Sequence, residues 1–504
     1  MKILDTSSLH SIVIGSGFAG IAMALRLKSL GYQVTLIERL DQIGGRARSF
    51  KKGNYKHDAG PTVITAPFLF RELYELFDEN LEDYLEFIHL DPYYRFYFSE
   101  TDQYFNYHAS IEDTQKEIRR YNEDDAEGYL ALLDASKNIY DVGFKKLVHR
   151  PFNRLGLMIS QIPALLKLKC YRTVWQMISS HLKHPLIRKA FSIHPLLIGG
   201  NPFTTTSIYA LIHYLERKWG VFFCMGGTSK LVSELENLML RQDINILKNS
   251  DVTKINHHNK RVHSIELSSG KLIDADLVVY AGDPETCYKE LLDERKVNFS
   301  LKPERKYSMG LYVLYFGTKN TYDDVAHHTI WMGNEYETLL KDIFDKKILN
   351  DDFSLYLHRP TATDKSFAPD GCDSFYVLCP VPNLQADIDW KKQGKILAGN
   401  IIKALDKTIL PNLSEDIEDI FWMTPNDFKE DYRSMYGAGF SIEPTLTQSA
   451  WFRYHNKHKS IHNLYFAGAG THPGAGLPGV VSSAKVVQEL ITGNEVSSGD
   501  PNVE

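Results

Sequence analysis

The chain has 504 residues, of which 43% are hydrophobic and 24% are charged, and its formal net charge at pH 7 is −6. This length and apolar content supply enough core for one large domain or two interleaved domains. The modest charge, with no long basic block, argues against nucleic acid as a partner, and the five scattered cysteines, which form no C-x-x-C pair, argue against a disulfide framework or a zinc site.

The first predicted elements are a strand, a tight turn and a helix. The apolar run 11–14 leads into the motif G-x-G-x-x-G at Gly15, Gly17 and Gly20, and an Ala- and Leu-rich segment follows at 21–30. In such a motif the first glycine allows the turn, the second lets the backbone approach a pyrophosphate, and the third lets helix and strand pack closely. The helix N-terminus then offers free N–H groups to the phosphates.

A second strand is predicted at 33–37, and it ends in Glu38. An acidic side chain at this place binds ribose hydroxyls and would repel the 2′-phosphate of NADP. Strand, helix, second strand and acid together predict a dinucleotide site rather than a plain structural turn. These residues fit NAD and FAD equally.

A second glycine cluster separates NAD from FAD. Gly44, Gly45 and Arg46 follow where a simple NAD dehydrogenase would enter its next helix. Two glycines with an arginine give a close backbone approach and a fixed cation, which suit a second phosphate or the ribityl chain of a flavin. An ordinary turn with a solvated arginine is the alternative. The segment "HDAGPT" at 57–62 predicts a further backbone platform.

The run from Gly15 through Thr62 resembles the N-terminus of the flavin-dependent amine oxidase and carotene desaturase superfamily. The segment "NLYFAGAGTHPGAGLPGVVSSAKVV" at 463–487 resembles the signature of the bacterial and fungal-type phytoene desaturases, and intervening segments such as "LYVLYFG" are similar in the same order. The resemblance implies FAD as cofactor and an oxidoreductase that acts on CH–CH groups. It also implies 15-cis-phytoene and acyclic carotene intermediates as substrates, oxidised stepwise towards lycopene, with a quinone or oxygen as electron acceptor. The residues expected to bind FAD are Gly15, Gly17, Gly20, Glu38, Gly44, Gly45, Arg46, Pro61, Thr62, Val252, Asp283, Gly470, Gly479 and Val480.

The remaining strands of the nucleotide domain are predicted in two later segments. One contains a hairpin-like stretch and the apolar strand "DLVVYAGDP", and the other leads into a helix that Pro478 opens. We therefore expect an α/β fold with a Rossmann-type FAD-binding domain assembled from the discontinuous segments 1–67, 224–300 and 456–504. A substrate domain with a helical membrane-facing cap is expected at 68–223, and the rest of the mixed-sheet substrate domain at 301–455.

The segment 144–184 carries the prediction about membranes. It interleaves a stripe of apolar residues with Lys145, Lys146, Arg150, Arg154, Lys167, Lys169 and Arg172. Basic residues beside an apolar stripe suit a surface pressed into lipid headgroups, and a cap packed on the protein with a solvated basic face is the alternative. Because a C40 hydrocarbon is dissolved in the bilayer, we expect the protein to attach peripherally to the cytoplasmic side of a membrane. The polar start of the chain predicts no cleavable signal, and no apolar run is long enough to predict a spanning helix.

Few residues are candidates for proton transfer. Asp134 and Lys137 lie one helical turn apart where the family has an Asp and an Arg, and Lys137 departs from that pattern because lysine lacks the planar fork of arginine. A surface ion pair is the alternative. His472 follows Gly470 and Thr471 close to the expected flavin ring, so it is a candidate base or orienting donor, or a residue that fixes the backbone of a turn.

The other histidines predict no metal site. The three in "YHNKHKSIHN" lie in a charged, turn-like stretch without an acidic partner. The adjacent pairs His257 with His258 and His327 with His328 are expected to point apart.

Other functions remain open from the residues alone. They are a desaturase of a related polyene such as C30 diapophytoene or a hydroxylated carotene, a relative that isomerises or saturates polyenes, a flavin amine oxidase, and a flavoprotein that binds without turnover.

Overall fold

The computed structural model describes residue 6 and residues 8–153, 155–292 and 305–494. The predicted boundary between residues 300 and 301, and Arg154 of the basic segment, lie outside the described residues. Within these ranges, none of the helices combines the length and the apolar character that crossing a bilayer requires.

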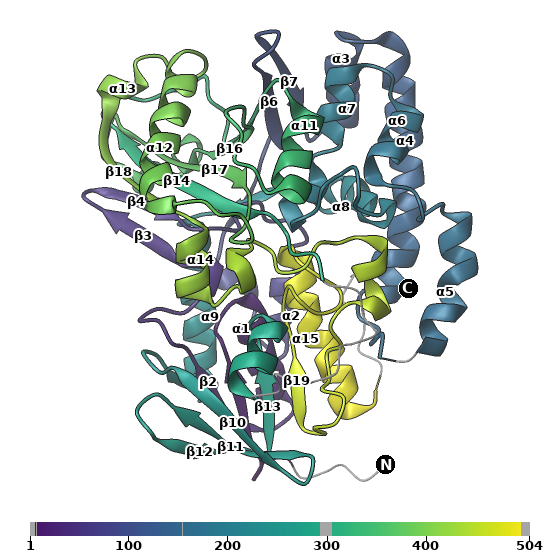
Figure 1. Cartoon of the computed structure of the whole chain (residues 1–504), viewed down its shortest axis with the longest axis vertical. Coiled ribbons are helices and arrows are strands. Elements are labelled where there is room, and N and C mark those ends of the chain that lie inside the picture. The colour runs from purple at the N-terminus through teal and green to yellow at the C-terminus, as the bar shows by residue number, and fades with distance from the viewer. Residues whose placement is uncertain (1–5, 7, 154, 293–304, 495–504) are drawn as a thin grey trace.

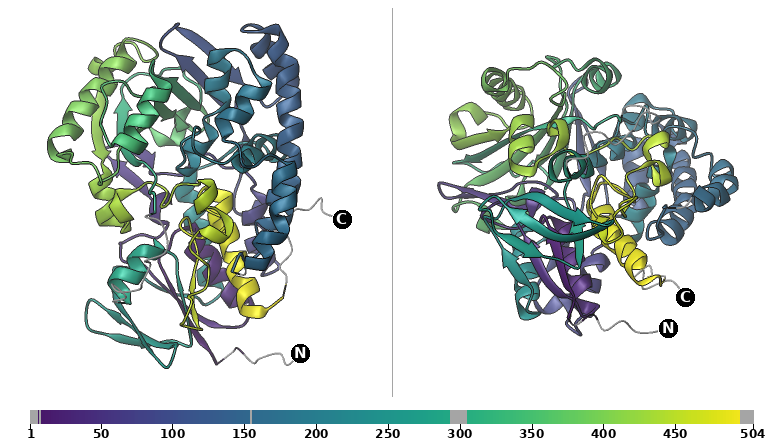
Figure 2. Two further views of the ribbon diagram at one scale, coloured as in Figure 1. Left: turned by 45° about the vertical axis from the view of Figure 1, so that its right-hand side comes forward. Right: turned by 60° about the horizontal axis from the view of Figure 1, so that its bottom comes forward.

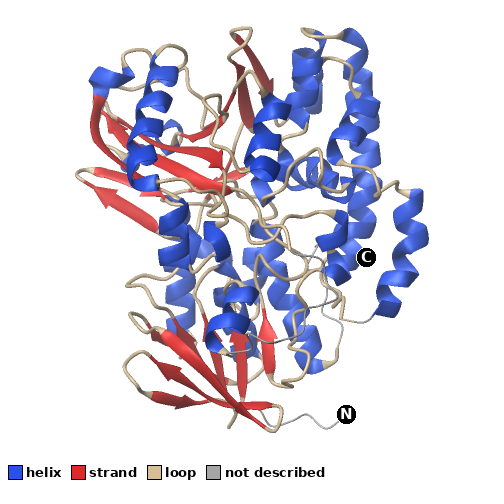
Figure 3. Ribbon diagram, viewed as in Figure 1, coloured by secondary structure: helices blue, strands red, loops and turns tan. Residues whose placement is uncertain are grey.

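A five-stranded parallel sheet occupies one end of the molecule, at the bottom of Figures 1 and 3. Its strands are short and, apart from one edge strand, apolar and mostly buried, as is usual for a parallel sheet covered on both faces. The sheet takes strands from each of the three segments predicted for the cofactor domain, because segment 1–67 supplies two, segment 224–300 two and segment 456–504 one. In spatial order the strands are β19 (Leu464–Phe466), β13 (Leu277–Tyr280), β1 (His10–Ile14), β2 (Gln33–Ile37) and β9 (Asn245–Leu247).

The two faces of this sheet are covered differently. Because successive residues of a strand point to opposite faces, Val13 of β1 packs into one core and Ile12 and Ile14 into another. The first core contains residues of α1 (Phe18–Ser29), α2 (Phe68–Glu75), α9 (Gly227–Arg241) and α15 (Leu477–Thr492). The second contains residues of an antiparallel sheet formed by β10 (Val252–His258), β11 (Arg261–Leu267) and β12 (Leu272–Asp274).

A second, seven-stranded sheet lies at the upper left of Figures 1 and 3. Neighbouring strands are antiparallel except for β15 and β6, which are parallel, so the sheet is mixed. It joins the two predicted inserts, since β6 and β7 come from the first and the other strands from the second. In spatial order the strands are β18 (Ile417–Met423), β14 (Gly310–Thr318), β17 (Asp373–Val381), β16 (Leu355–His358), β15 (His328–Met332), β6 (Tyr94–Phe98) and β7 (Gln103–Tyr107).

The helix α12 (Trp390–Asp406) covers one face of this sheet through Trp390, Leu397 and Ile401. The other face belongs to a core shared with the helical insert. Smaller elements complete the second half of the chain, namely α10 (Pro284–Thr286), α11 (Tyr336–Lys341), α13 (Leu413–Asp416) and α14 (Pro425–Tyr432). Two small antiparallel pairs complete the fold. One is the hairpin of β3 (Ser49–Lys52) and β4 (Tyr55–Asp58), and the other joins the distant strands β5 (Phe87–His89) and β8 (Phe222–Cys224).

The helical insert lies beside the mixed sheet, as both views of Figure 2 show. Its longest helix begins after Asn122, whose side chain accepts a hydrogen bond from the N–H of Asp125 at 3.3 Å, and three acidic residues in the first turn favour this start. One helix, at the right-hand edge of Figure 1, has no buried side chain. The helices of the insert are α3 (Ile111–Arg119), α4 (Glu123–Val142), α5 (Leu155–Lys167), α6 (Val174–His181), α7 (Pro185–Phe191) and α8 (Leu211–Trp219), and α5 is the one without buried side chains.

Candidate functional site

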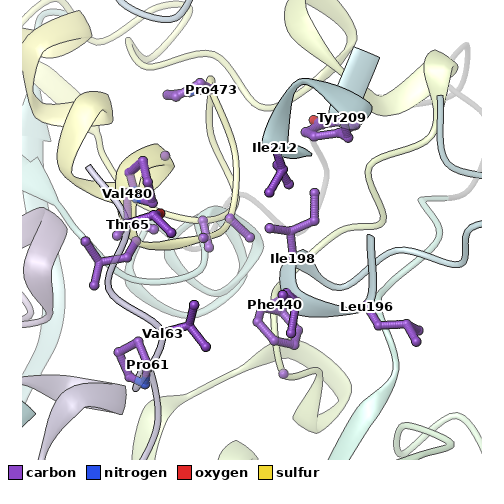
Figure 4. A pocket seen from close by; sticks show the side chains of 18 of the residues that line it. Pro61, Val63, Thr65, Leu196, Ile198, Tyr209, Ile212, Phe440, Pro473 and Val480 are labelled. Atoms are coloured by element: carbon purple, nitrogen blue, oxygen red, sulfur yellow. The ribbon is translucent and has the colours of Figure 1, made fainter. Parts of the chain in front are cut away.

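A cavity of about 450 Å³ lies where the parallel sheet, the mixed sheet and the helical insert meet. Figure 4 shows Pro61, Val63 and Thr65 on one side of it, with Ile198 and Ile212 across from them. Most lining side chains are apolar, which is typical of a site that binds a largely hydrocarbon ligand and excludes water.

The carboxyl ends of three parallel strands open into this cavity. The loops that follow β1, β13 and β19 contribute Gly17, Ala281 and Gly468 to its wall. Ligands of open α/β sheets bind outside the carboxyl ends of the strands, so the fold places the predicted dinucleotide motif where a ligand is expected.

The three glycines of the first motif meet different surroundings. Gly15 has a φ of +95°, which favours glycine in the turn. A Cβ at Gly20 would lie 1.9 Å from the carbonyl oxygen of Gly15, so only glycine lets α1 pack against the turn. A Cβ at Gly17 would meet no atom within 4 Å, and the φ of Gly17 is an ordinary −66°. The start of α1 therefore faces an open cradle at Gly17, as a pyrophosphate requires.

Glu38 is held firmly at the end of β2. Its Oε2 accepts hydrogen bonds from the N–H of Ser16 at 3.0 Å and from Ser16 Oγ at 2.6 Å, and its Oε1 accepts one from the N–H of Leu40 at 2.9 Å. The carboxylate is 6% exposed and lies beside the turn rather than in the cavity wall. These contacts fix an anion next to the glycine motif, at the place predicted for ribose recognition.

Arg46 brings a positive charge into the cavity wall, and Gly44 precedes it with a φ of +108°. Its guanidinium donates a hydrogen bond to Ser434 Oγ, while its Nε is buried without a partner among the described residues. Burial lowers the pKa of Arg46, and nearby Asp283 opposes that shift. Asp283 caps a turn by accepting from the N–H of Glu285 at 3.1 Å, and its second oxygen is buried without a partner in the described part of the chain. An unused, buried guanidinium N–H fits an anionic ligand group.

The predicted platform at 57–62 forms part of the wall through Pro61 and Thr62. The hydroxyl of Thr62 lies 2.7 Å from the hydroxyl of Tyr356 on β16. A Cβ at Gly60 would lie 2.2 Å from the carbonyl oxygen of Arg46, so the platform packs directly on the second glycine cluster.

The C-terminal signature supplies a further part of the wall, where Gly479 and Val480 lie in the first turn of α15, and Figure 4 shows Val480 beside Thr65. Gly470 is not among the lining residues, and a Cβ there would lie 2.5 Å from Pro284. His472 lines the cavity and is 7% exposed. Its Nε2 lies 3.1 Å from the carbonyl oxygen of Leu147, and burial lowers the pKa of the imidazole to about 4. The ring is therefore neutral, with Nε2 donating and Nδ1 carrying a lone pair.

Asp134 and Lys137 lie away from this site, contrary to their predicted catalytic placement. Both are exposed on α4, whose buried face carries neighbouring residues such as Ser136, and neither lines the cavity. Lys137 pairs with Asp141 at 3.3 Å rather than with Asp134. The helix turns this part of its surface to solvent, so a catalytic role for Asp134 or Lys137 finds no support in the cavity and stays a prediction.

Val252 also lies outside the cavity wall. Its side chain packs in the core between the parallel sheet and the antiparallel sheet, and its carbonyl oxygen accepts a hydrogen bond from Arg433 at 3.2 Å. A contact with the cofactor at Val252 remains a prediction.

Sequence reasoning missed Glu216, which lies on α8 and is 1% exposed. Among the described lining residues it is the one that carries a carboxyl group. Its Oε1 accepts a hydrogen bond from Tyr94 at 2.7 Å and its Oε2 lies 2.9 Å from Nε2 of His194. No local signal marks it, since "LERK" is typical of an exposed helical surface.

A family model and similar sequences identify the family of this chain, and a solved structure shows the likeness of fold. A family model described as flavin containing amine oxidoreductase matches residues 18–487. The chain is 42% identical over 492 residues to the lycopene-forming phytoene desaturase of a Paracoccus species. The match covers 97% of this chain and 98% of that relative. It is 41% identical over 484 residues to the lycopene-forming phytoene desaturase of Pantoea ananas, with 95% and 98% covered. The solved structure of wild-type putrescine oxidase bound to putrescine has a TM-score of 0.63 at 12% identity, covers 96% of this chain and 98% of its own, and shows the likeness of fold.

Proposed function

The chain belongs to the family of flavin containing amine oxidoreductases, as its two terminal motifs predicted, and we propose that it is an FAD-dependent desaturase that converts phytoene stepwise towards lycopene. The observation that carries the proposal is that one continuous cavity is lined both by the glycine motif at Gly17 and by apolar side chains of the mixed sheet and the helical insert. The relatives named as phytoene desaturases match nearly end to end, which supports the same chemistry here.

The residues present fit FAD at the polar end of the cavity. The open cradle at Gly17, the N-termini of α1 and α15, and the free N–H of Arg46 suit a pyrophosphate and its linked ribityl chain. Glu38 lies where ribose hydroxyls are bound. When bound, an oxidised flavin supplies a hydride acceptor for an allylic C–H bond.

The apolar end fits an extended polyene. Side chains of the helical insert and the mixed sheet, such as Leu197, Leu311 and Ile330, line it without offering hydrogen bonds. These walls would hold the hydrocarbon in one orientation and exclude water from the reacting carbons. Binding and orientation are therefore the main tasks of the chain.

Two side chains can stabilise the positive charge and accept the proton that this reaction produces. Loss of hydride from the polyene leaves an allylic cation, and the carboxylate of Glu216 would stabilise positive charge strongly in an apolar cavity. A proton must then leave the adjacent carbon. The neutral His472 has a lone pair at Nδ1 that can accept it.

We expect Glu216→Gln to lower kcat by about 100-fold. The amide keeps the shape of the side chain but removes the negative charge from the cavity wall. Turnover of phytoene in liposomes measures the effect, and the exposed Glu127→Gln on α4 is the matched control that should keep wild-type turnover. Wild-type kcat in Glu216→Gln would exclude an electrostatic role for this carboxylate.

The proposal includes peripheral attachment to the cytoplasmic side of a membrane, with a quinone or oxygen reoxidising the flavin. The helix α5 supports it, because Met158, Gln161 and Leu165 line the cavity while other apolar side chains of the same helix face outward. The outward residues are Leu155, Ile159, Ile162 and Leu166, which are 43–56% exposed. A helix placed in this way can meet lipid on one face and admit a lipid-dissolved substrate on the other.

We expect the double variant Ile159→Glu with Leu166→Glu to bind anionic vesicles at least about tenfold more weakly than the wild type, since two buried apolar contacts with lipid are replaced by charges. Flotation with the vesicles measures this. The control carries the same changes at Leu240 and Ile396, which are 55% and 45% exposed on other helices. Equal flotation of both variants would contradict docking through α5.

Expression in a host that accumulates phytoene tests the function as a whole. Chromatography should show phytoene consumed and red lycopene formed. Unchanged phytoene together with conversion of C30 diapophytoene or hydroxylated carotenes would assign a different polyene, and amine-dependent peroxide release would assign an amine oxidase.

A further inference from the structure

Three histidines form a buried cluster outside the cavity. His328 begins β15, His358 ends the neighbouring strand β16, and the two are paired in register across these strands. His327 joins them from the bend before β15. One ring nitrogen from each lies within 4.8 Å of the others. The exposed fractions of His327, His328 and His358 are 6%, 0% and 0%.

Four ring nitrogens of this cluster lack a hydrogen-bond partner among the described residues. They are Nε2 of His327, Nε2 of His328 and both nitrogens of His358. Leaving buried polar atoms unpaired costs free energy, so four unpaired nitrogens in one place indicate a site for a ligand. A neutral imidazole carries a lone pair on one ring nitrogen, and a metal ion binds such a lone pair.

The outer nitrogens of two of the rings are already oriented. Nδ1 of His327 lies 2.7 Å from Thr363 Oγ1, and Nδ1 of His328 lies 2.8 Å from the hydroxyl of Tyr356. A histidine that binds a metal through one nitrogen usually donates its other N–H to an oxygen in this way. When Nδ1 of His327 and Nδ1 of His328 each carry the hydrogen, the lone pair of each ring is at Nε2 and faces the cluster.

We propose that His327, His328 and His358 bind a divalent metal ion of the zinc class. Imidazole nitrogens without carboxylate or thiolate suit zinc and its transition-metal neighbours rather than calcium or magnesium. Zinc holds such nitrogens at about 2.0–2.1 Å, so each ring would move inward by roughly 0.7 Å from the present spacing.

The ion would stabilise the two strands β15 and β16, which also contribute residues to the cavity wall. It would tie β15 to β16 and, through Thr363, to the turn that follows. With His328 bound at Nε2, its Nδ1–H donates to Tyr356, and the hydroxyl of Tyr356 donates to Thr62 in the predicted cofactor platform. The inference is independent of which polyene is the substrate.

Sequence reasoning excluded this site because adjacent residues of a strand point apart. The rule fails at His327, which lies in a bend and not in the strand, so its ring can approach that of His328 to a centroid separation of 4.7 Å. The third member is thirty positions further along the chain and meets them only through strand pairing.

Metal analysis of the tag-free flavoprotein tests the proposal. After loading with Zn²⁺ and dialysis against a weak chelator, about one zinc ion should remain per chain, and X-ray absorption should show imidazole nitrogens at about 2.0–2.1 Å. His358→Phe keeps an aromatic ring in the packing and should retain less than about a tenth of that zinc.

The matched control is His213→Phe, because His213 is also buried with two unpartnered nitrogens but lies outside the cluster. It should bind zinc as the wild type does. A wild type that retains no zinc, cobalt or nickel, or zinc bound equally by His358→Phe, would overturn the proposal. If His358→Phe does not fold, the absorption spectrum of the wild type decides alone, since a shell without imidazole would refute the site.

Discussion

Gly17→Val should give a folded protein that has lost its flavin. The backbone at Gly17 has a φ of −66° that valine accepts, and its Cβ would meet no protein atom within 4 Å, so folding is not impaired. The new side chain would instead fill the cradle in front of α1, where the pyrophosphate is expected. We expect the dissociation constant of FAD to rise by at least about 100-fold, or about 2.8 kcal/mol, and pigment formation to cease.

Equilibrium dialysis with FAD and the thermal unfolding midpoint of the protein without flavin measure the two parts of this result. The control is Gly399→Val, because Gly399 also has open space at its Cβ but lies exposed on α12. Normal flavin content in purified Gly17→Val would show that the glycine motif does not hold the cofactor.

Glu72→Gln should destabilise the protein severely. Glu72 of α2 lies between Arg26 of α1, at 2.8 Å, and Lys485 of α15, and the two cations are 1% and 0% exposed. Although burial opposes the shift, Arg26 and Lys485 lower the pKa of Glu72. The amide would remove the carboxylate that pairs with both buried cations, so we expect the free energy of unfolding to fall by about 3–5 kcal/mol.

The pH dependence distinguishes this cause from a packing defect. Burial lowers the pKa of Lys485 to about 8 from 10.5. The unfolded chain therefore binds the proton of Lys485 more tightly, and stability from this group rises as the pH increases through that interval. Urea unfolding should show the loss in Glu72→Gln partly recovered at higher pH, while Glu127→Gln, at an exposed position on α4, should keep wild-type stability. An unchanged unfolding midpoint in Glu72→Gln would contradict the charge argument.

Local features of the cofactor site could be predicted because short-range geometry determines them. The turn at Gly15, the close contact at Gly20 and the open space at Gly17 follow from one strand-turn-helix unit, and the glycine spacing encodes all three. The return of strands from distant segments was also predictable, because apolar runs such as "LVVY" are typical of buried parallel strands.

Features that depend on tertiary contacts were not predictable. The spacing of Asp134 and Lys137 gives their separation on a helix, but which side of α4 faces the core depends on packing against other helices. Glu216 looks like a solvated residue until Tyr94 and His194, from two other elements, surround it. The cluster around His358 likewise forms through strand pairing, between strands that α11 separates in the sequence.

Anaerobic mixing of the purified yellow protein with phytoene in liposomes tests the central claim most directly, which is that one cavity presents a polyene to a bound flavin. We expect the yellow absorbance to disappear while a carotene with one more double bond forms in equal amount. A flavin that stays oxidised, with phytoene recovered unchanged, would contradict it.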